Sequence, residues 1–116
     1  MPNKPETGMY GQKLAEGYLT GMGCTVLRRN YRGAGGEIDL IVEDGPYVSF
    51  VEVKYRKSLE YGLPREAVNA SKLRTIRRTA QHYIAFKKLG ERDYRFDVVE
   101  VLDMDGRVSI EWIKNV

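Results

Sequence analysis

The sequence predicts an α/β protein whose mixed β-sheet is flanked by two helices. Apolar residues recur with the helical period in residues 8–22 and 71–88, whereas three runs between these helices and two runs after them follow the two-residue period of a strand. The predicted order is helix, three strands, helix, two strands. Strands joined by short turns pair antiparallel, and the second helix is long enough to carry the chain to a strand parallel to its neighbour.

Length and composition indicate one domain spanning residues 1–116, with a polar tail over residues 1–6. A chain of 116 residues that is 42% hydrophobic can bury roughly two-thirds of its unfolded surface, so a bound metal would be functional rather than structural. The single cysteine, Cys24, cannot form an intramolecular disulfide. No apolar run approaches the roughly 20 residues of a membrane helix, and the N-terminus lacks the apolar core of a signal peptide. We expect a cytoplasmic protein with no membrane partner.

The first helix is expected over residues 8–22, with Thr7 as its N-terminal cap and Gly23 at its end. Gln12 and Glu16 lie one turn apart on its polar edge, where either could complete a metal site. A solvated helix charge is the simpler interpretation of Glu16. The apolar stripe comprises Leu14, Ala15, Tyr18, Leu19 and Met22.

Residues 25–31 are expected to form the first strand, and the glycine-rich residues 32–36 form a turn into the second. No lysine, serine or threonine follows these glycines at the spacing of a phosphate-binding loop. The turn therefore predicts backbone flexibility beside a site, not a nucleotide cradle. Its flanking arginines, which can reach phosphates, are Arg28, Arg29 and Arg32.

The second and third strands, within residues 36–54, place charged residues inside otherwise apolar runs. Asp39 shares a face with Ile41, and Glu52 shares a face with Phe50. Because apolar residues lie on this charged face, we expect another element to cover it. The opposite face of the second strand carries Ile38, Leu40 and Val42.

Parity limits how these two strands can pair. Opposite residues in an antiparallel pair point to the same face, so Asp39 meets Glu52 only if the loop has an even number of residues. A four-residue loop over 44–47 meets this condition and sets the two Cβ atoms roughly 5 Å apart, close enough for both carboxylates to share a divalent cation. The same register pairs Ile41 with Phe50 and Glu37 with Lys54.

The expected cation is Mg²⁺ or Mn²⁺, because these ions prefer oxygen ligands. Lys54 follows Glu52 on the same face and could orient a water nucleophile or neutralise charge on a phosphoryl oxygen. The alternative role for Lys54 is a salt bridge to Glu37. For Asp39 and Glu52, the alternative is a pair satisfied by backbone donors and basic residues.

Basic residues cluster after the third strand and along the second helix. Arg56 and Lys57 alternate with Tyr55 and Tyr61, as in a rim that binds a nucleic-acid backbone and stacks on bases. The second helix has no acidic residue between Lys72 and Lys88, which favours an anionic partner over a merely solvated face. Its basic residues include Lys72, Arg74, Arg77 and Arg78.

The second helix is expected to be capped by Asn69 or Ser71 and to be stopped by Gly90. Its buried stripe should comprise Leu73, Ile76, Ala80, Tyr83 and Ile84. Two further strands, over 94–102 and 107–113, follow around the turn 103–106, with Trp112 as a core residue and Asp97 in a structural role.

Four stretches of the chain resemble the YraN-type family of small bacterial proteins: GEIDLI at 36–41, FVEVKYR at 50–56, YG at 61–62 and RFDVV at 95–99. The resemblance covers nearly the whole chain. That family is similar to PD-(D/E)xK nucleases, close to archaeal Holliday-junction resolvases. The resemblance implies a restriction-endonuclease-like fold and a metal-dependent phosphodiesterase site at Asp39, Glu52 and Lys54.

One position departs from the family pattern. The first helix in this family commonly carries a glutamate directly after a glycine, whereas Gln12 follows Gly11 here. An amide oxygen is a weaker ligand than a carboxylate for a hard cation, so the helix contribution to the metal site stays open.

We therefore expect a Mg²⁺- or Mn²⁺-dependent endonuclease that acts on DNA, including branched DNA. A homodimer would give the symmetry needed to cut paired strands. The alternative is a non-catalytic nucleic-acid-binding or assembly module that retains the nuclease fold.

Overall fold

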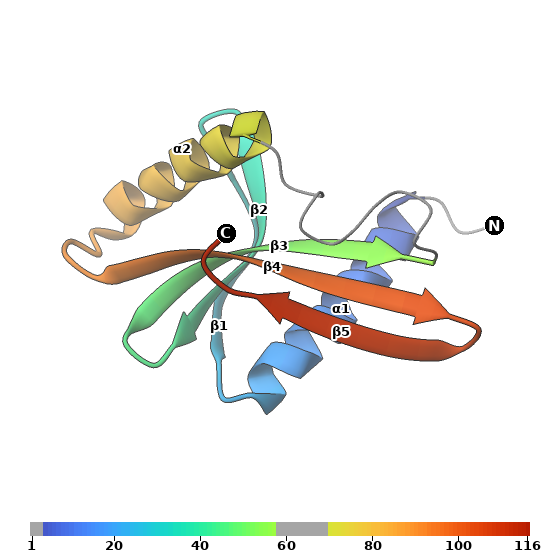
Figure 1. The fold of residues 1–116 in the computed structure, drawn as a ribbon. Coiled ribbons are helices and arrows are strands. Elements are labelled where there is room, and N and C mark those ends of the chain that lie inside the picture. The colour runs from blue at the N-terminus through green and yellow to red at the C-terminus, as the bar shows by residue number, and fades with distance from the viewer. Residues whose placement is uncertain (1–3, 58–69) are drawn as a thin grey trace.

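The computed structural model describes residues 4–57 and 70–116 as two helices and a five-stranded mixed sheet (Figure 1). The sheet order is β1-β2-β3-β4-β5; β3 and β4 pair in parallel and all other neighbours are antiparallel. The predicted fold class, element order and strand directions are confirmed. The elements are α1 (Lys4–Gly21), β1 (Thr25–Gly33), β2 (Gly36–Asp44), β3 (Tyr47–Arg56), α2 (Ala70–Lys87), β4 (Asp93–Met104) and β5 (Arg107–Ile113).

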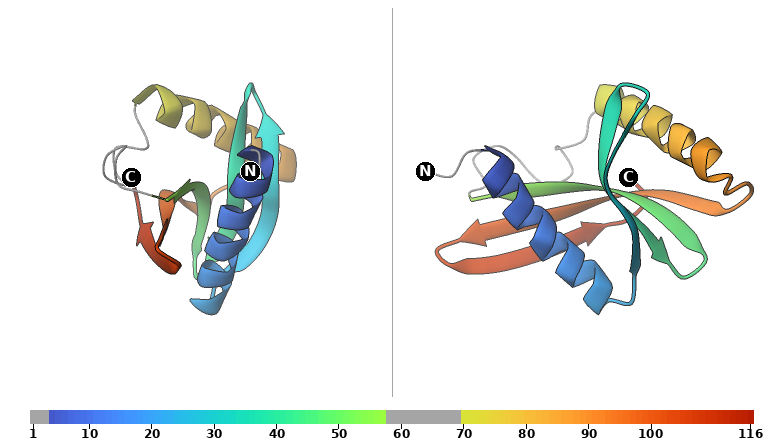
Figure 2. Two further views of the ribbon diagram at one scale, coloured as in Figure 1. Left: turned by 90° about the vertical axis from the view of Figure 1, so that its right-hand side faces the viewer. Right: turned by 180° about the vertical axis from the view of Figure 1, so that it is seen from behind.

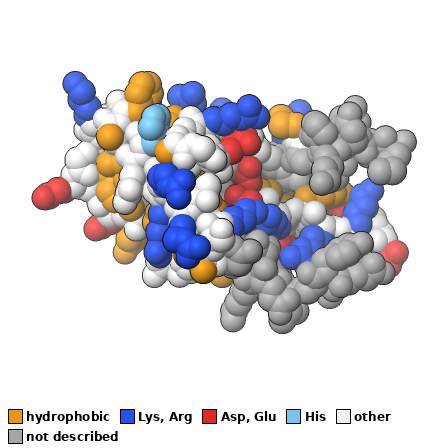
Figure 3. Space-filling view, turned by 90° about the horizontal axis from the view of Figure 1, so that it is seen from above, with side chains coloured by type: hydrophobic (Ala, Val, Ile, Leu, Met, Phe, Trp, Pro, Cys, Tyr) orange, Lys and Arg blue, Asp and Glu red, His pale blue; other side chains and the backbone are white. Residues whose placement is uncertain are grey.

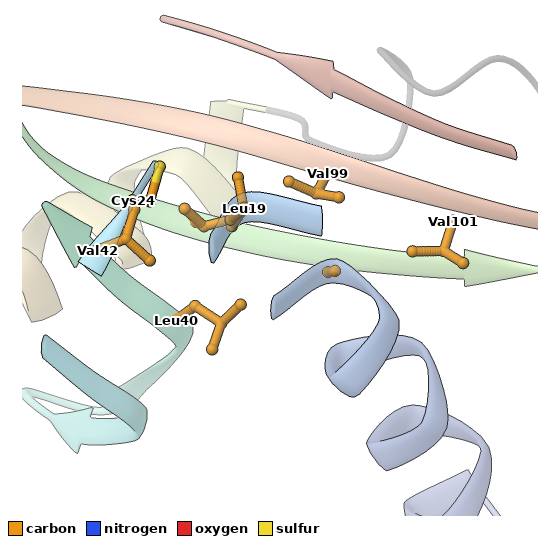
Figure 4. Close-up of a cluster of buried hydrophobic side chains, with 8 residues drawn as sticks. Leu19, Cys24, Leu40, Val42, Val99 and Val101 are labelled. Carbon is orange, nitrogen blue, oxygen red and sulfur yellow. The ribbon is translucent and has the colours of Figure 1, made fainter. Parts of the chain in front are cut away.

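The two helices cover different parts of the sheet. Helix α1 crosses one face and contacts β3, β4 and β1, whereas α2 contacts β2 and β1 (Figure 2). A separate hydrophobic core lies beneath each helix. Figure 4 shows the core beneath α1, where Leu19 and Cys24 meet side chains of the sheet; the labelled strand residues are Leu40, Val42, Val99 and Val101.

The core beneath α2 explains the apolar residues on the charged face of the central strands. Ile41 and Phe50 are buried there against Ile76 and Tyr83 of α2. The expectation that another element covers this face is confirmed. Thr79, which the apolar pattern did not single out, is also fully buried and donates a hydrogen bond to the carbonyl oxygen of Gly33 at 2.9 Å.

The β1–β2 hairpin does not keep strict alternation. Ile38, expected beside Leu40 and Val42, packs in the α2 core with Tyr31 instead. A register shift between Val26 and Arg28 and a left-handed Asn30, with φ of 51°, interrupt the regular strand geometry of β1. Such irregularities bend and twist a strand pair, so its faces turn along its length.

The predicted start of the first helix is wrong. Helix α1 begins at Lys4, so residues 4–6 do not form a tail and Thr7 lies inside the helix rather than capping it. Pro5 is compatible with this earlier start, because the first turn of a helix needs no hydrogen bond from the proline nitrogen. Met22 follows the end of the helix and is 58% exposed, so it does not belong to the buried stripe. Gly23 ends this region as expected, with φ of 100°.

The ends of α2 also differ from expectation. Ser71 lies inside the helix and is not its cap, whereas Asn69 lies outside the described residues. The helix ends at Lys87, and Lys88 takes the left-handed conformation with φ of 53°, so the chain leaves the helix before Gly90. Of the expected stripe, Ile76, Ala80 and Tyr83 are buried, whereas Leu73 and Ile84 are half-buried.

The hairpin turns are tighter than predicted. Asp44 pairs with Tyr47, so the loop has two residues, Gly45 and Pro46, instead of four. The even loop length that the parity argument requires is nevertheless present. The last hairpin is shortened in the same way, because Met104 pairs with Arg107 around a two-residue turn.

Close approach of α1 to β3 depends on Gly11. A Cβ atom at this position would lie 2.6 Å from Cβ of Tyr55, whereas a Cβ atom on Gly17 of the same helix would meet nothing within 4 Å. We predict that Gly11→Ala lowers the free energy of unfolding by about 1–3 kcal/mol, because the helix must move off the strand.

The matched control is Gly17→Ala, which should raise the free energy of unfolding by about 0.5–1 kcal/mol through helix propensity. Urea denaturation followed by circular dichroism measures both variants. Equal effects of the two substitutions would contradict the close packing at Gly11.

Candidate functional site

The candidate site lies where β2 and β3 separate. Their ladder runs from Asp44 opposite Tyr47 to Leu40 opposite Val51, and it includes the predicted pair of Ile41 and Phe50. Beyond this point β2 stays paired with β1, and β3 stays paired with β4. The sheet therefore forks, as the diverging ribbons of β2 and β3 show in Figure 1.

The side chain of Asp39 fills the start of the fork. Its Oδ2 accepts a hydrogen bond from the backbone N–H of Val53 at 2.8 Å, in place of a ladder bond between the strands. The pairs of Asp39 with Glu52 and of Glu37 with Lys54 are accordingly absent from the ladder, although both would continue its register. Asp39 and Glu52 therefore lie on diverging strands outside regular pairing, where the charge of Glu52 still acts on Asp39.

The pKa of Asp39 is raised by its surroundings at the fork. The pKa of Asp39 is raised to about 6, first by burial and then by the negative charge of Glu52, whose effect exceeds that of Glu37. The hydrogen bond from Val53 and the charge of Lys54 act in the opposite direction. The site therefore holds a carboxyl group whose ionisation is disfavoured until a positive charge approaches.

Glu52 is held by two lysines. Lys54 Nζ lies 3.4 Å from Glu52 Oε1, and Lys72 Nζ from α2 lies 2.8 Å from the same oxygen. The side chain of Glu52 is only 12% exposed, so these contacts are partly shielded from water. The alternative salt bridge of Lys54 to Glu37 is not formed; Glu37 instead lies 3.8 Å from Nε of Arg32.

The two lysines differ in acidity. Burial lowers the pKa of Lys54, and the adjacent Lys72 lowers it further against the opposing effect of Glu52. Burial is the largest single effect on Lys72 and acts to lower its pKa, but the hydrogen bonds to Glu52 and Lys54 and the charges of Glu52 and Asp39 together outweigh burial and raise the pKa. Lys72 is thus the more firmly protonated of the two.

Helix α1 carries Gln12, whose side-chain amide is hydrogen-bonded to Asn30 of β1. Gln12 is 6% exposed and exchanges two hydrogen bonds with Asn30, at 3.0 and 3.1 Å. Asn30 also donates to Glu37 Oε1 at 3.2 Å. Sequence reasoning did not single out Asn30; the tolerance of asparagine for left-handed backbone was the available signal.

Glu16 lies in an ion pair. Both of its carboxylate oxygens accept hydrogen bonds from Arg29 at 2.7 Å, and the first cause of its lowered pKa is this contact. The simpler interpretation of Glu16 as a helix charge therefore fits the geometry better than a role in the metal site.

The predicted nucleic-acid-binding residues fall into two groups. Arg56 and Lys72 face acidic partners, since Nε of Arg56 lies 3.1 Å from the buried Glu100 and Lys72 contacts Glu52. The others are exposed, and Figure 3 shows acidic side chains bordered by lysine and arginine side chains on one face of the molecule. The exposed group comprises Arg32, Lys57, Arg74, Arg77 and Arg78. Tyr61 lies outside the described residues.

Asp97 has the structural role expected of it. Its carboxylate accepts hydrogen bonds from the hydroxyl of Ser49 at 2.7 Å, from the guanidinium of Arg95 at 2.9 Å and from Nε1 of Trp112 at 2.9 Å. The backbone N–H of Asn115 donates at 2.9 Å. This buried carboxylate is saturated by its partners, in contrast to Asp39.

The donor set at the fork fits a divalent cation with few protein ligands. Within residues 4–57 and 70–116, no group of three or more His, Cys, Asp or Glu side chains is placed to hold a metal ion. Mg²⁺ usually keeps several water ligands and binds through one or two carboxylates plus substrate phosphates. Asp39 and Glu52 match that requirement, and the raised pKa of Asp39 indicates that a cation would relieve their repulsion.

The fold and the site define an α/β protein with a forked mixed sheet and a half-buried cluster of carboxylates and lysines. The chain belongs to the UPF0102 family, which is the YraN-type family: the model described as "Uncharacterised protein family UPF0102" matches residues 11–101. The predicted family membership is confirmed.

Relatives of high similarity come from several bacteria. A UPF0102 protein of Clostridium acetobutylicum is 52% identical over 97 residues, covering 84% of this chain and 80% of the relative. A UPF0102 protein of Caldicellulosiruptor saccharolyticus is 43% identical over 115 residues, covering 97% of this chain and 98% of the relative. A UPF0102 protein of Alkaliphilus metalliredigens is 46% identical over 108 residues, covering 93% and 94%.

Neither α1 nor α2, nor any other helix in the described ranges, is long and apolar enough to cross a membrane. This agrees with the absence of a long apolar run from the sequence.

The raised pKa of Asp39 predicts a pH-dependent loss of stability in metal-free protein. The folded state favours the protonated carboxyl, so its contribution to stability is present below the ordinary pKa of 3.8 and is lost as the pH rises through about 6. Asp39→Asn keeps an acceptor for the Val53 N–H and should be more stable than wild type at about pH 8 by on the order of 1–3 kcal/mol. The gain should vanish below about pH 4.

Urea denaturation with a chelator present, from about pH 4 to 8, measures this difference. Asp105→Asn, an equal change of charge at an exposed turn position, is the matched control and should leave the pH dependence unchanged. Parallel pH profiles for wild type and Asp39→Asn would contradict the raised pKa of Asp39.

Proposed function

We propose that this protein is a metal-dependent nuclease of the PD-(D/E)xK superfamily that hydrolyses phosphodiester bonds in DNA. The observation that carries the proposal is the fork between β2 and β3, where Asp39, Glu52 and Lys54 interact in one half-buried cluster. Two carboxylates and a lysine are the groups that such a reaction needs to hold a divalent cation and a phosphate. The resemblance of GEIDLI and FVEVK to the superfamily motif supports the same assignment.

Each residue of the cluster has a role that follows from its surroundings. Asp39 and Glu52 would hold Mg²⁺ or Mn²⁺, and a bound ion of this kind stabilises charge on a phosphoryl oxygen and makes a water molecule more acidic. Lys54 lies next to Glu52 with a lowered pKa, so its amino group can donate to a phosphoryl oxygen or hold the attacking water in place. Val53 fixes the orientation of Asp39 through its backbone N–H.

The exposed basic residues of α2 supply a surface for the DNA backbone. Arg74, Arg77 and Arg78 are exposed, and no acidic residue of the helix offsets their charge. Phosphate contacts of this kind position a substrate without reading its sequence. Branched DNA, and a homodimer able to cut paired strands of a junction, belong to this proposal as its most specific form.

We predict that the purified protein cleaves DNA in the presence of Mn²⁺ and that Asp39→Asn and Lys54→Met each reduce the rate by at least about a hundredfold. The substrates are linear duplex, single-stranded and four-way-junction DNA. Asp39→Asn is preferred to Asp39→Ala because it preserves an acceptor for Val53 and thus the fork.

Lys13→Met is the matched control for the lysine substitution, since Lys13 is exposed on α1. It should leave the rate unchanged. Cleavage that persists in both site variants would come from a contaminant, and absence of cleavage on all three substrates would count against the enzyme.

A second candidate function is binding of nucleic acid without cleavage. The residue type and the hydrogen bonds of Gln12 favour it. The position where the family commonly has a glutamate carries an amide that is occupied by Asn30. A cluster that had lost its third acidic side chain could keep the fold and the basic surface while losing the reaction.

For such a binder we predict a steep loss of DNA affinity with salt, and a shallower salt dependence when basic residues of α2 are removed. Each of Arg74→Gln and Arg78→Gln should reduce the slope of the logarithm of affinity against the logarithm of salt concentration by about one. Fluorescence anisotropy with labelled duplex measures this slope.

Asp39→Asn separates the two candidates, because a pure binder should be indifferent to it with or without Mn²⁺. Binding that does not respond to salt would contradict a phosphate-binding surface on α2.

A further inference from the structure

The ammonium group of Lys72 occupies one of the two candidate metal ligands. Lys72 lies in the first turn of α2, and its Nζ is 2.8 Å from Glu52 Oε1, closer than the 3.4 Å of Lys54 Nζ. The side chain of Lys72 is 33% exposed and that of Glu52 is 12% exposed, so the contact is largely shielded from water. One carboxylate oxygen is therefore shared by a lysine from the strand and a lysine from the helix.

The charges of this cluster balance without a metal ion. When all four groups are ionised, Asp39 and Glu52 carry two negative charges, and Lys54 and Lys72 carry two positive charges. A divalent cation would add two positive charges beside the ammonium groups, in surroundings where charges interact more strongly than in water. A divalent cation held by Glu52 would compete with the ammonium group of Lys72 for the negative charge of the same carboxylate.

We propose that Lys72 is an internal counter-cation of Glu52 that a divalent metal ion displaces when it binds. The inference rests on the proposed nuclease function and concerns the regulation of that same site. Lys72 is the group that leaves because it comes from a separate element, its side chain is 33% exposed, and it lies on the same helix as the exposed arginines. Lys54 lies on the same strand as Glu52, so it remains beside Glu52 when Lys72 leaves.

The displaced ammonium group acquires a second role. In metal-free protein Lys72 is engaged by Glu52, so it contributes little to DNA binding. After displacement it can bind a phosphate of the substrate, next to the exposed arginines of α2. Metal loading therefore converts a lysine that neutralises the site into one that binds DNA.

The first test measures Mn²⁺ affinity by titration calorimetry in the absence of DNA and at constant ionic strength. Removing the competing charge in Lys72→Met should strengthen Mn²⁺ binding by about tenfold. Lys72→Gln, measured in parallel, should show the same gain with a polar side chain, and Lys72→Arg should bind like wild type because it keeps the positive charge.

Arg74→Met is the matched control. It removes the same charge from the same helix, but Arg74 is exposed, so Mn²⁺ affinity should change by less than about twofold at ordinary ionic strength. A gain equal to that of Lys72→Met would mean that the net charge of the helix, and not the contact with Glu52, governs metal binding, and this would overturn the inference.

The second test measures DNA affinity without metal and with saturating Ca²⁺, an oxygen-binding ion that serves as a non-catalytic substitute. Lys72→Met should weaken DNA binding by less than about twofold without metal and by about fivefold with Ca²⁺, as expected if the displaced ammonium group binds one phosphate. Equal losses under both conditions would overturn the second role of Lys72.

Failure of the inference is distinguishable from failure of the proposed function. If wild type binds Mn²⁺ and loses it in Glu52→Gln, but Lys72→Met binds no more tightly, the metal site stands and the counter-cation is refuted. If neither wild type nor Lys72→Met binds Mn²⁺, both the metal site and this inference are overturned.

Discussion

The separation of β2 from β3 after Leu40 and Val51 is the constraint on which the rest of the structure depends. Beyond this point β2 stays paired with β1 and β3 stays paired with β4, and the carboxylate of Asp39 accepts a hydrogen bond from the backbone N–H of Val53. A carboxylate at this position is half-buried and close to Glu52, which disfavours its charge. The division of the sheet thus leaves the carboxylates of Asp39 and Glu52 in one half-buried region, where positively charged groups stabilise them.

Both helices approach this part of the sheet closely, because glycines at the contacts leave room for them. At Gly11 the backbone of α1 packs directly on Tyr55, and the next residue, Gln12, reaches Asn30. At Gly36 a side chain would collide with Thr75 of α2, so only glycine lets the helix lie against the start of β2. That contact holds the helix whose first turn delivers Lys72 to Glu52. The glycine at position 36 therefore allows the close packing of α2 that places the charge of Lys72 beside Glu52.

The contrast between the buried carboxylate of Asp97 and the half-buried carboxylate of Asp39 separates a structural group from a functional candidate. Asp97 is surrounded by donors from Ser49, Arg95, Trp112 and the backbone of Asn115, and these bonds join the central strands to the C-terminal end of the chain. Asp39 has one backbone donor and a negatively charged neighbour. A saturated carboxylate stabilises a fold, whereas one left short of partners is available to a ligand. The family model matches residues 11–101 of this chain, a span that includes both Asp39 and Asp97.

The sequence by itself determined the order and direction of the strands, because hydrophobic periods and turn residues act locally and a helical crossover favours a parallel neighbour. It also singled out Asp39, Glu52 and Lys54 as candidate site residues, since charges within apolar strands stand out and parity restricts how they can meet. Only the tertiary structure decided that β2 and β3 part before those residues pair, that Asn30 holds Gln12, and that Lys72 reaches Glu52. These contacts join elements that are far apart in the chain. They depend on how two helices pack on a twisted, forked sheet, and local sequence patterns do not predict that packing.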